Sequence, residues 1–309
     1  MSRSFQDPRL TEQRNPDTSA IDMASPLAIV DLIGAQDASI PAAVAGARRE
    51  MAQAIELIEA AFRRGGRLVY IGAGTSGRLG VLDATECPPT FRSEPETVVG
   101  VIAGGYDALV RSAEGAEDDR EAGAAAMDHL AISERDVVVG IAASGSTPYV
   151  QAALQRARRL GARTVGVSCS APAPELREES DVVIYVPVGP EVVTGSTRMK
   201  AGTATKLVLN TLSTGAMIRV GKVYGNLMVD LQAWSDKLVD RGERIVMEAT
   251  GADRARARQA IEDAGGAVKT AMVMVKRSVD RAAAEALLAE HDGRLRAIIG
   301  DPPPVVPHD

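Results

Sequence analysis

Two short loops rich in serine, threonine and glycine are the segments of this sequence best suited to bind a phosphate. The first, at residues 72–77, reads G-A-G-T-S-G, and the second, at residues 144–147, reads S-G-S-T. Each follows an apolar run and precedes a helical pattern. Because a helix N-terminus has unpaired N–H groups and partial positive charge, two such loops side by side would bind one phosphate. The residues expected to bind it are Thr75, Ser76, Ser144, Gly145, Ser146 and Thr147.

Each loop is also compatible with a more ordinary role. Taken singly, Thr147 is a plausible helix N-cap and Ser144 an ordinary turn residue. The first loop also contains G-x-G-x-x-G, which is typical of dinucleotide-binding turns. Such turns need an acidic residue at the end of the second strand, but here residues 97–105 end in A-G-G, and Glu94 and Glu96 precede that run. The sequence therefore favours a small phosphate ligand over NAD, and no cofactor is expected.

The elements that position these loops alternate between strands and helices. Alanine-rich helical patterns cover residues 108–130 and 148–160. Because buried apolar strands alternating with helices are typical of parallel sheets, we expect an α/β fold with a five-stranded parallel sheet and helices on both faces. The five predicted strands are residues 67–72, 97–105, 136–145, 163–169 and 181–187.

Outside the sheet, helical spacing predicts further helices, and the chain is expected to have four parts. The predicted helices are residues 26–33, 42–64, 202–220, most of 226–238 and most of 252–300. The predicted parts are an N-terminal arm with the first helix (1–45), a sheet domain (46–235), a small helical domain (236–300) and a disordered tail (301–309).

Composition excludes several classes of partner. A net charge of −6 and an aromatic content of 3% disfavour nucleic-acid binding, which normally requires a basic face or a stacking surface. The sequence has no run of 18 uncharged apolar residues, and its start lacks the apolar core of a signal peptide, so we expect a cytoplasmic protein with no membrane partner. Two cysteines, Cys87 and Cys169, form neither a disulfide framework nor a metal-ligand cluster, so no metal site is expected.

With both loops in view, the sequence resembles the sugar isomerase domain family and, within it, the N-acetylmuramic acid 6-phosphate etherases. The resemblance covers about residues 10–250 and implies the sugar isomerase fold, with residues 46–235 binding a phosphosugar. One departure is Ser146, which stands where the family loop S-G-R-T has arginine. The matching segments are TEQRNPDT, GAGTSGRLGVLDATECPPTF, AEGAEDD, VVVGIAASGSTPYV, EVVTGSTRMKAGTATKLVLN and GKVYGNLMVDLQA.

The resemblance implies cleavage of the C3 D-lactyl ether of N-acetylmuramic acid 6-phosphate, a step in the recycling of cell-wall amino sugars. The products would be N-acetylglucosamine 6-phosphate and D-lactate. In the open-chain sugar, the C1 aldehyde acidifies the C2 proton, so that lactate can leave from C3 by elimination before water adds. This route needs a general base, a general acid and hydrogen-bond donors for the enolate-like charge.

Two glutamates are expected to supply the acid and the base. By resemblance, Glu86 in ATECPPT matches the proton donor of the family, and Glu117 in AEGAEDD matches its second catalytic glutamate, the expected base. From the residues alone, each is also explained as a solvated carboxylate on a helix, and Pro88 and Pro89 are expected to end the helix that carries Glu86. For the pair to act as acid and base, burial must push their pKa values apart.

Three further expectations remain open at this point. An aldose–ketose isomerase of the same fold would use the same C2 deprotonation without releasing lactate. A non-enzymatic regulator similar to the glucokinase regulatory protein would bind a sugar phosphate without turning it over. We also expect a homodimer, because the segments at residues 201–220 and 226–234 are richer in apolar residues than one domain needs.

Overall fold

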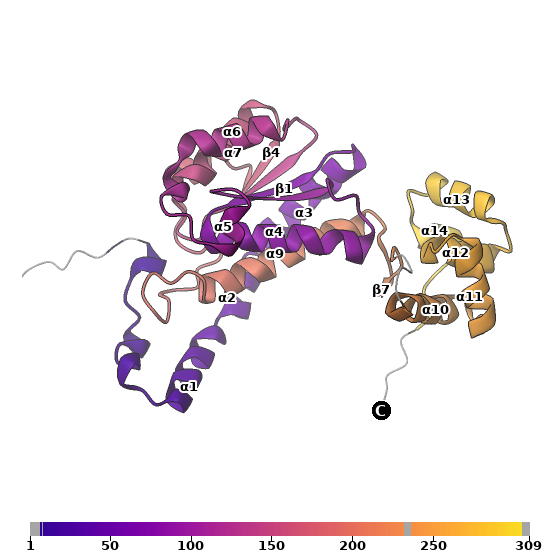
Figure 1. The fold of residues 1–309 in the computed structure, drawn as a ribbon, viewed down its shortest axis with the longest axis horizontal. Helices are drawn as coiled ribbons and strands as arrows, with labels where there is room; N and C mark the ends of the chain where they lie inside the picture. The colour runs from indigo at the N-terminus through magenta and orange to yellow at the C-terminus, as the bar shows by residue number, and fades with distance from the viewer. Residues whose placement is uncertain (1–6, 8, 232–235, 305–309) are drawn as a thin grey trace, which may run out of the picture. The chain divides into compact units, whose positions relative to one another are not determined.

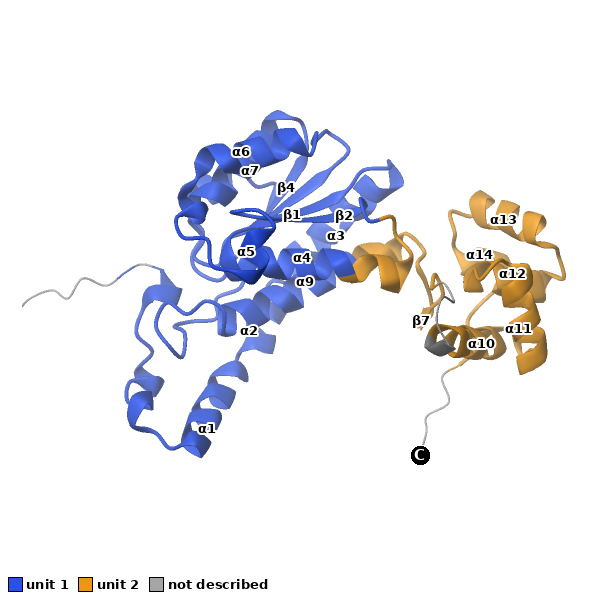
Figure 2. Cartoon of the chain, viewed as in Figure 1, with its two compact units in different colours: residues 1–85, 95–213 blue, residues 86–94, 214–309 orange. Residues whose placement is uncertain are grey.

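The computed structural model describes residues 7, 9–231 and 236–304 of the 309-residue chain. The chain divides into two compact units, coloured separately in Figure 2. Unit 1 comprises residues 1–85 and 95–213, and unit 2 comprises residues 86–94 and 214–309. Each unit has a hydrophobic core of its own.

Unit 1 contains the five-stranded parallel sheet that the sequence predicts, so the α/β fold class is confirmed (Figure 1). The strand order is β2-β1-β3-β4-β5, which places β1 between β2 and β3. All residues of β1 and β3 are buried, as expected for central strands covered on both faces. The strands are β1 (Leu68–Gly72), β2 (Val98–Ile102), β3 (Val137–Ile141), β4 (Arg163–Ser168) and β5 (Val182–Tyr185).

Helices cover both faces of this sheet. α6 (Arg120–His129) and α7 (Pro148–Arg159) lie on one face, and α3 (Arg48–Arg63) lies on the other (Figure 1). The short helix α8 (Pro174–Glu178) precedes β5. The core beneath α7 is aliphatic and includes Val69, Ile71, Val138, Val150, Leu154 and Leu176.

A buried tyrosine joins two more helices to the face that carries α3. The hydroxyl of Tyr70 in β1 donates to Asp83 Oδ2 of α4 (Gly74–Phe91) at 2.9 Å. It also lies 3.4 Å from the carbonyl oxygen of Leu209 in α9 (Lys200–Arg219). Because a buried hydroxyl without a partner is costly, this network fixes α4 and α9 against β1.

The N-terminal arm contains three short 3-10 turns before α1 (Pro26–Asp37): η1 (Leu10–Glu12), η2 (Pro16–Thr18) and η3 (Ile21–Met23). The arm is bonded to loops that follow the strands. The backbone N–H of Thr11 donates to Ser170 Oγ at 3.1 Å, and the hydroxyl of Thr18 donates to the Val192 carbonyl at 2.8 Å.

α1 and the helix that follows it are apolar but exposed. The stretch Pro26–Gly46 is long and apolar enough to cross a membrane by length and composition, with a mean hydropathy of 1.4, and 11% of it is buried. It is not one continuous helix, because α1 ends at Asp37 and α2 (Ile40–Gly46) is a separate element. No residue of α1 is buried.

Two predicted helices are interrupted. The predicted helix at residues 42–64 is divided at Ala47, whose φ of −93° and ψ of 18° separate α2 from α3. The predicted helix at residues 108–130 consists of α5 (Asp107–Val110), the 3-10 turn η4 (Ala116–Asp118) and α6. Gly115 breaks the pattern because its φ of 73° is left-handed.

The prediction that Pro88 and Pro89 end their helix is wrong, because α4 continues through both prolines to Phe91. Both prolines lie in the last turn of α4. Because proline has no backbone N–H, the helix loses only two hydrogen bonds to the preceding turn. Arg92, the residue after α4, adopts a left-handed φ of 50° and donates its backbone N–H to the Pro88 carbonyl at 2.9 Å.

Within unit 2, a short hairpin follows α9 and includes residues that the sequence predicts to be helical. β6 (Val223–Tyr224) and β7 (Leu227–Met228) pair antiparallel across a turn in which Gly225 has a φ of 60°. The predicted helix at residues 226–238 is therefore wrong for its first residues, and its part at 232–235 lies outside the described residues. A glycine at positive φ is what a two-residue hairpin turn requires.

The predicted helical region at the C-terminus is confirmed. It contains α10 (Asp236–Thr250), α11 (Arg254–Asp263), α12 (Val268–Arg277), α13 (Arg281–Glu290) and α14 (Leu295–Ile299). Asp253 and Asp280 cap α11 and α13 by accepting backbone N–H groups of the first turn. Val246, Ile261, Val268, Met272 and Leu295 are among the residues that form its core. The last five residues of the predicted tail, 305–309, lie outside the described residues.

Candidate active site

The first loop joins β1 to α4 by a turn that only glycine allows. A Cβ on Gly72 would lie 2.8 Å from the backbone nitrogen of Gly77, and a Cβ on Gly77 would lie 2.6 Å from the carbonyl oxygen of Gly72. These approaches bring the start of α4 directly onto the end of β1. The G-x-G-x-x-G pattern therefore serves strand–helix packing here, and it presents Thr75 and Ser76 in the first turn of α4.

The second loop is similar in form and lies between β3 and α7. Gly145 has a φ of 80°, and a Cβ there would lie 2.9 Å from the carbonyl oxygen of Ala171. Thr147 is the N-cap residue of α7, but its side chain makes no capping hydrogen bond. The hydroxyls of Ser144 and Ser146 lie 3.4 Å apart. A capping role for Thr147 therefore does not account for its hydroxyl.

The structure brings the two loops to the same edge of the sheet. Gly72 at the end of β1 pairs in register with Ile141 at the end of β3. Within the part of the chain that the structure describes, the side chains of Thr75, Ser76 and Thr147 make no hydrogen bond, and all three are partly exposed. Hydroxyls and helix N-termini that meet in this way are suited to an anion.

A cavity of about 320 Å³ lies beside the first loop. Its lining includes Gly74 and Arg78 of α4, Ala103 after β2, and the segment that carries Glu114 and Glu117. Glu117 lies in η4 and not in a regular helix, and its side chain is exposed. The structure thus brings Glu117 together with the first loop, while the second loop does not line this cavity.

Glu86 lies elsewhere on the molecule. It is exposed and belongs to the same helix as Thr75 and Ser76, but it lies ten residues beyond Ser76. At 1.5 Å per residue this places Glu86 about 15 Å along α4 from Ser76. Within one chain, α4 therefore does not bring Glu86 to the loop that it follows.

Arg78 is a cavity residue that the sequence analysis does not single out. Its Nε donates to the carbonyl oxygen of Leu109 at 3.0 Å, and its Nη2 donates to that of Arg111 at 3.1 Å. These bonds hold the segment before Glu114 and Glu117 against α4. The sequence feature that could have identified Arg78 is its position one turn into the helix that follows the first glycine-rich loop.

A third loop, between β5 and α9, is anchored by buried charges. Glu191 is fully buried, and its carboxylate accepts the backbone N–H groups of Lys200 and Ala201 at 2.9 Å each. Burial raises the pKa of Glu191, and the two backbone hydrogen bonds oppose that shift. Burial also lowers the pKa of Lys200, although the charge of Glu191 favours its protonated form. This pair supports the N-terminus of α9, where a carboxylate is favoured.

Two protein-family models match the sheet domain. The model of the glucokinase regulatory protein N-terminal SIS domain matches residues 50–158. The model of the SIS domain, the sugar isomerase domain, matches residues 117–215. Together these segments cover β1 to β5 and both hydroxyl-rich loops.

Curated relatives match almost the whole chain. The N-acetylmuramic acid 6-phosphate etherase of Edwardsiella ictaluri is 52% identical over 295 residues, which cover 96% of this chain and 98% of that protein. The relative of the same name from Rhodopirellula baltica is 51% identical, with 94% of this chain and 96% of that protein covered. The one from Aliivibrio fischeri is 49% identical, with 94% and 97% covered. The chain therefore belongs to the N-acetylmuramic acid 6-phosphate etherase family.

Proposed function

We propose that this chain cleaves the C3 D-lactyl ether of N-acetylmuramic acid 6-phosphate, as a carbon–oxygen lyase that yields N-acetylglucosamine 6-phosphate and D-lactate. The observation that carries the proposal is the match to etherases over almost the full length of both chains. The site agrees in character, because the first hydroxyl-rich loop lies beside a cavity lined by glutamates, and the second loop follows the neighbouring strand at the same edge of the sheet.

The reaction begins with the open-chain sugar. Removal of the C2 proton creates an enolate-like charge, and the C3–O bond to lactate breaks as the C2–C3 double bond forms. Water then adds its oxygen to C3 and a proton to C2 of the unsaturated aldehyde. We assign the C2 base to Glu117, because its carboxylate lines the cavity beside the first loop.

The phosphate is assigned to the two hydroxyl-rich loops. Thr75 and Ser76 belong to the first, and Ser144, Gly145, Ser146 and Thr147 to the second. Their support is the register of β1 and β3, which end at the same edge, and the absence of competing hydrogen bonds at the hydroxyls of Thr75, Ser76 and Thr147 among the described residues. No cofactor enters this scheme, because the aldehyde of the sugar itself supplies the electron sink.

Glu86 is assigned as the acid that protonates the departing lactyl oxygen, on the resemblance to the family. Because Glu86 lies about 15 Å along α4 from Ser76, it needs another way to reach the sugar. We propose that the enzyme is a homodimer in which a second copy completes each cavity. Glu86 and Glu117 are both exposed in the single chain, so the second copy and the substrate would bury them.

The exposed apolar helix α1 supports a homodimer. Leu27 is 71% exposed and Val30 is 65% exposed, and an unpacked helix of this length is marginal in water. A membrane is a poorer partner for this segment, since Asp31 and Asp37 lie within it and neither α1 nor α2 reaches the roughly 20 residues that a spanning helix needs. We place the reaction in the cytoplasm, in keeping with a phosphorylated substrate and a buried thiol at Cys169.

The test is to incubate the purified full chain with N-acetylmuramic acid 6-phosphate and to measure D-lactate. In ¹⁸O-labelled water, elimination followed by hydration puts the label in the C3 hydroxyl of the sugar and none in lactate. Because the C1 aldehyde exchanges its oxygen with water, N-acetylglucosamine 6-phosphate incubated in the same water gives the background, and fragment mass spectrometry separates C1 from C3. Label in lactate would contradict the elimination route.

The same assay separates the alternatives. A phosphosugar isomerase would convert a sugar phosphate without releasing lactate. A regulator of the glucokinase regulatory protein type, whose domain model matches residues 50–158, would bind the sugar phosphate and leave it unchanged. Absence of D-lactate with intact phosphosugar binding would favour one of these two.

A further inference from the structure

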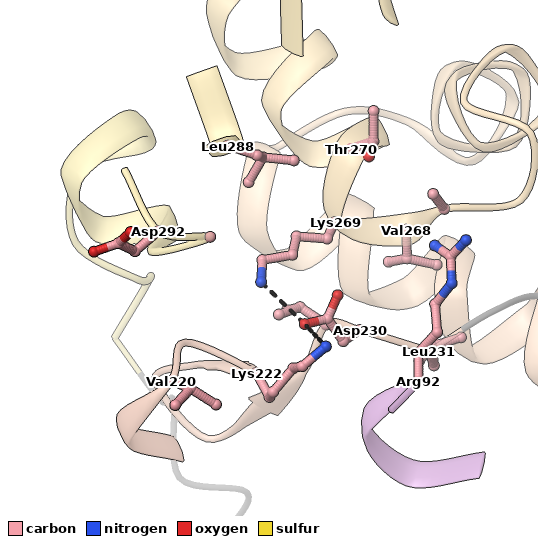
Figure 3. A pocket seen from close by; sticks show the side chains of 13 residues that line it. Arg92, Val220, Lys222, Asp230, Leu231, Val268, Lys269, Thr270, Leu288 and Asp292 are labelled. Atoms are coloured by element: carbon pink, nitrogen blue, oxygen red, sulfur yellow. Dashed lines mark hydrogen bonds and ion pairs between the residues drawn. The ribbon is translucent and has the colours of Figure 1, made fainter. Parts of the chain in front are cut away.

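A second cavity, of about 290 Å³, lies within unit 2 (Figure 3). The segment before α10, the start of α12 and the loop after α13 form its walls, together with Arg92 just beyond α4. None of its lining residues belongs to the hydroxyl-rich loops or to the cavity of Glu117. A ligand here would therefore occupy a site distinct from the proposed active site.

One side of this cavity is a cluster of charged side chains around the buried Lys269. Lys269 is 8% exposed, and its Nζ donates to the Gly221 carbonyl at 2.7 Å and to Asp230 Oδ2 at 3.0 Å. Lys222 Nζ lies 3.5 Å from the same carboxylate oxygen, so two ammonium groups share it (Figure 3). An ammonium has three N–H bonds, and within the described part of the chain the third of Lys269 has no acceptor.

Arg92 adds a third cation to the cavity wall. Its left-handed φ of 50° is a strained conformation for a residue with a Cβ. Figure 3 shows its side chain beside Leu231 and Val268. Across the described residues, its guanidinium makes no hydrogen bond and no ion pair. Five donors are thus available at the edge of a cavity that already contains two lysines.

The side chains that line this cavity carry a net positive charge. Arg92, Lys222 and Lys269 face two carboxylates, those of Asp230 and Asp292, which leaves one net positive charge. The rest of the wall is largely apolar, with Val220, Val229, Leu231, Val268 and Leu288 among its members. A monoanion with an apolar body matches both features, whereas a phosphate dianion would leave an excess of negative charge.

We propose that this cavity binds a small organic carboxylate, with its anionic group held by the cluster of Arg92, Lys222 and Lys269 and its apolar part against the aliphatic wall. The volume accommodates a chain of several carbon atoms. D-Lactate, which the proposed reaction releases, is a smaller anion of the same kind. The proposal does not depend on that reaction, because it is tested by binding and not by turnover.

The experiment is calorimetric titration of the full chain with hexanoate, D-lactate, inorganic phosphate and the neutral analogue 1-hexanol. Hexanoate is expected to bind with a Kd of about 1 mM, and 1-hexanol at least about 10-fold more weakly, because charge-assisted hydrogen bonds are lost. Binding of D-lactate that is tighter than that of hexanoate and is weakened by Arg92→Gln or Lys222→Gln would support the same cavity with the reaction product as its ligand. Because the hydroxyl-rich loops are also proposed to bind phosphate, the deciding comparison uses the cavity variants: phosphate binding that is tighter than that of either carboxylate and is weakened by both Arg92→Gln and Lys222→Gln would overturn the carboxylate assignment.

Variants locate the site. Arg92→Gln and Lys222→Gln are each expected to weaken hexanoate binding about 5-fold or more. Arg277→Gln, which changes an exposed arginine at the end of α12, is the matched control and should leave the affinity unchanged. Weakening in either cavity variant with an unchanged control supports the proposal. Absence of saturable hexanoate binding to the wild-type chain, or equal affinity in wild type and both cavity variants, overturns it.

Discussion

The Nε of Arg78 donates a 3.0 Å hydrogen bond to the backbone carbonyl oxygen of Leu109. Arg78 follows Ser76 by two residues in α4, and the segment after Leu109 leads to Glu114 and Glu117. A single guanidinium therefore joins the helix of the first hydroxyl-rich loop to the segment that carries the proposed base. Because η4 is only one turn long, that segment has little regular structure of its own.

Arg78→Lys is expected to lower kcat for D-lactate release by about 10- to 100-fold, because a lysine ammonium cannot reproduce both guanidinium bonds and small displacements of a catalytic group are costly. The KM should change less than kcat, since the hydroxyl-rich loops are untouched. Steady-state kinetics check this. Arg135→Lys, at an exposed arginine outside the cavity, is the control. An unchanged kcat in Arg78→Lys would contradict the positioning role.

Glu117→Gln is expected to lower kcat by about 10²- to 10⁴-fold, which is the usual contribution of a general base. Binding of N-acetylglucosamine 6-phosphate, measured by calorimetry, should change little, because the amide keeps the size of the side chain. Asp118→Asn, at the neighbouring exposed carboxylate, is the matched control and should retain activity. Full turnover by Glu117→Gln would remove this residue from the mechanism.

Glu86→Gln is expected to be similarly inactive, and its position on α4 allows a sharper test. If a second copy completes each cavity, unfolding and refolding a mixture of Glu86→Gln and Glu117→Gln chains gives mixed dimers with one intact site. Random pairing then predicts recovery of about a quarter of wild-type activity. Each variant refolded alone is the control. If one chain supplied both glutamates of a site, the mixture would stay inactive.

The strands, their order along the chain and the helical C-terminal region follow from local patterns in the sequence. β-branched runs such as residues 136–145 bury both faces, so β3 is evident without tertiary information. The glycine-rich loops are evident too, because a turn as tight as that at Gly72 and Gly77 excludes other residues.

What the sequence does not predict depends on contacts between distant residues or on single backbone conformations. α4 continues past Pro88 to Phe91, whereas a proline signal alone predicts that the helix ends there. The break at Gly115, which places Glu117 in a 3-10 turn, depends on one left-handed residue. The bonds of Arg78 to the 109–111 segment join residues about 30 positions apart, which periodicity does not detect.

Asp136→Asn is expected to destabilise the chain by about 2 kcal/mol at pH 7, measured by urea unfolding. The Asp136 carboxylate accepts hydrogen bonds from Arg67 Nε at 3.1 Å, Arg67 Nη2 at 2.9 Å and the backbone N–H of Ser133 at 3.0 Å. These bonds join the starts of β1 and β3. Asp128→Asn, which removes an exposed ion pair with Arg156, should change stability by less than about 1 kcal/mol.

The lowered pKa of Asp136 predicts how the destabilisation by Asp136→Asn depends on pH. Burial alone would raise the pKa of Asp136, but the hydrogen bonds from Arg67 and Ser133 outweigh it and hold the pKa below its ordinary value. A carboxyl whose pKa falls on folding stabilises the protein above its unfolded pKa of about 3.9, and that contribution is lost as the pH falls through the folded pKa. The gap between wild type and Asp136→Asn should therefore narrow below about pH 4. A gap independent of pH would contradict the role of the charge.

The double variant Leu27→Glu, Val30→Glu is expected to dissociate the proposed homodimer. Both side chains lie on α1, are largely exposed in the single chain, and would be buried against a second copy, where two carboxylates are costly. In sedimentation at micromolar concentration, the wild-type chain should have twice the 32.4 kDa mass of one chain, and the variant the mass of one. Arg135→Glu, at an exposed arginine before β3 that belongs neither to α1 nor to the cavity lining, is the control and should remain dimeric. A wild-type chain that sediments as a monomer would contradict the dimer, whereas a double variant that stays dimeric would place the interface on another face, such as that of α9.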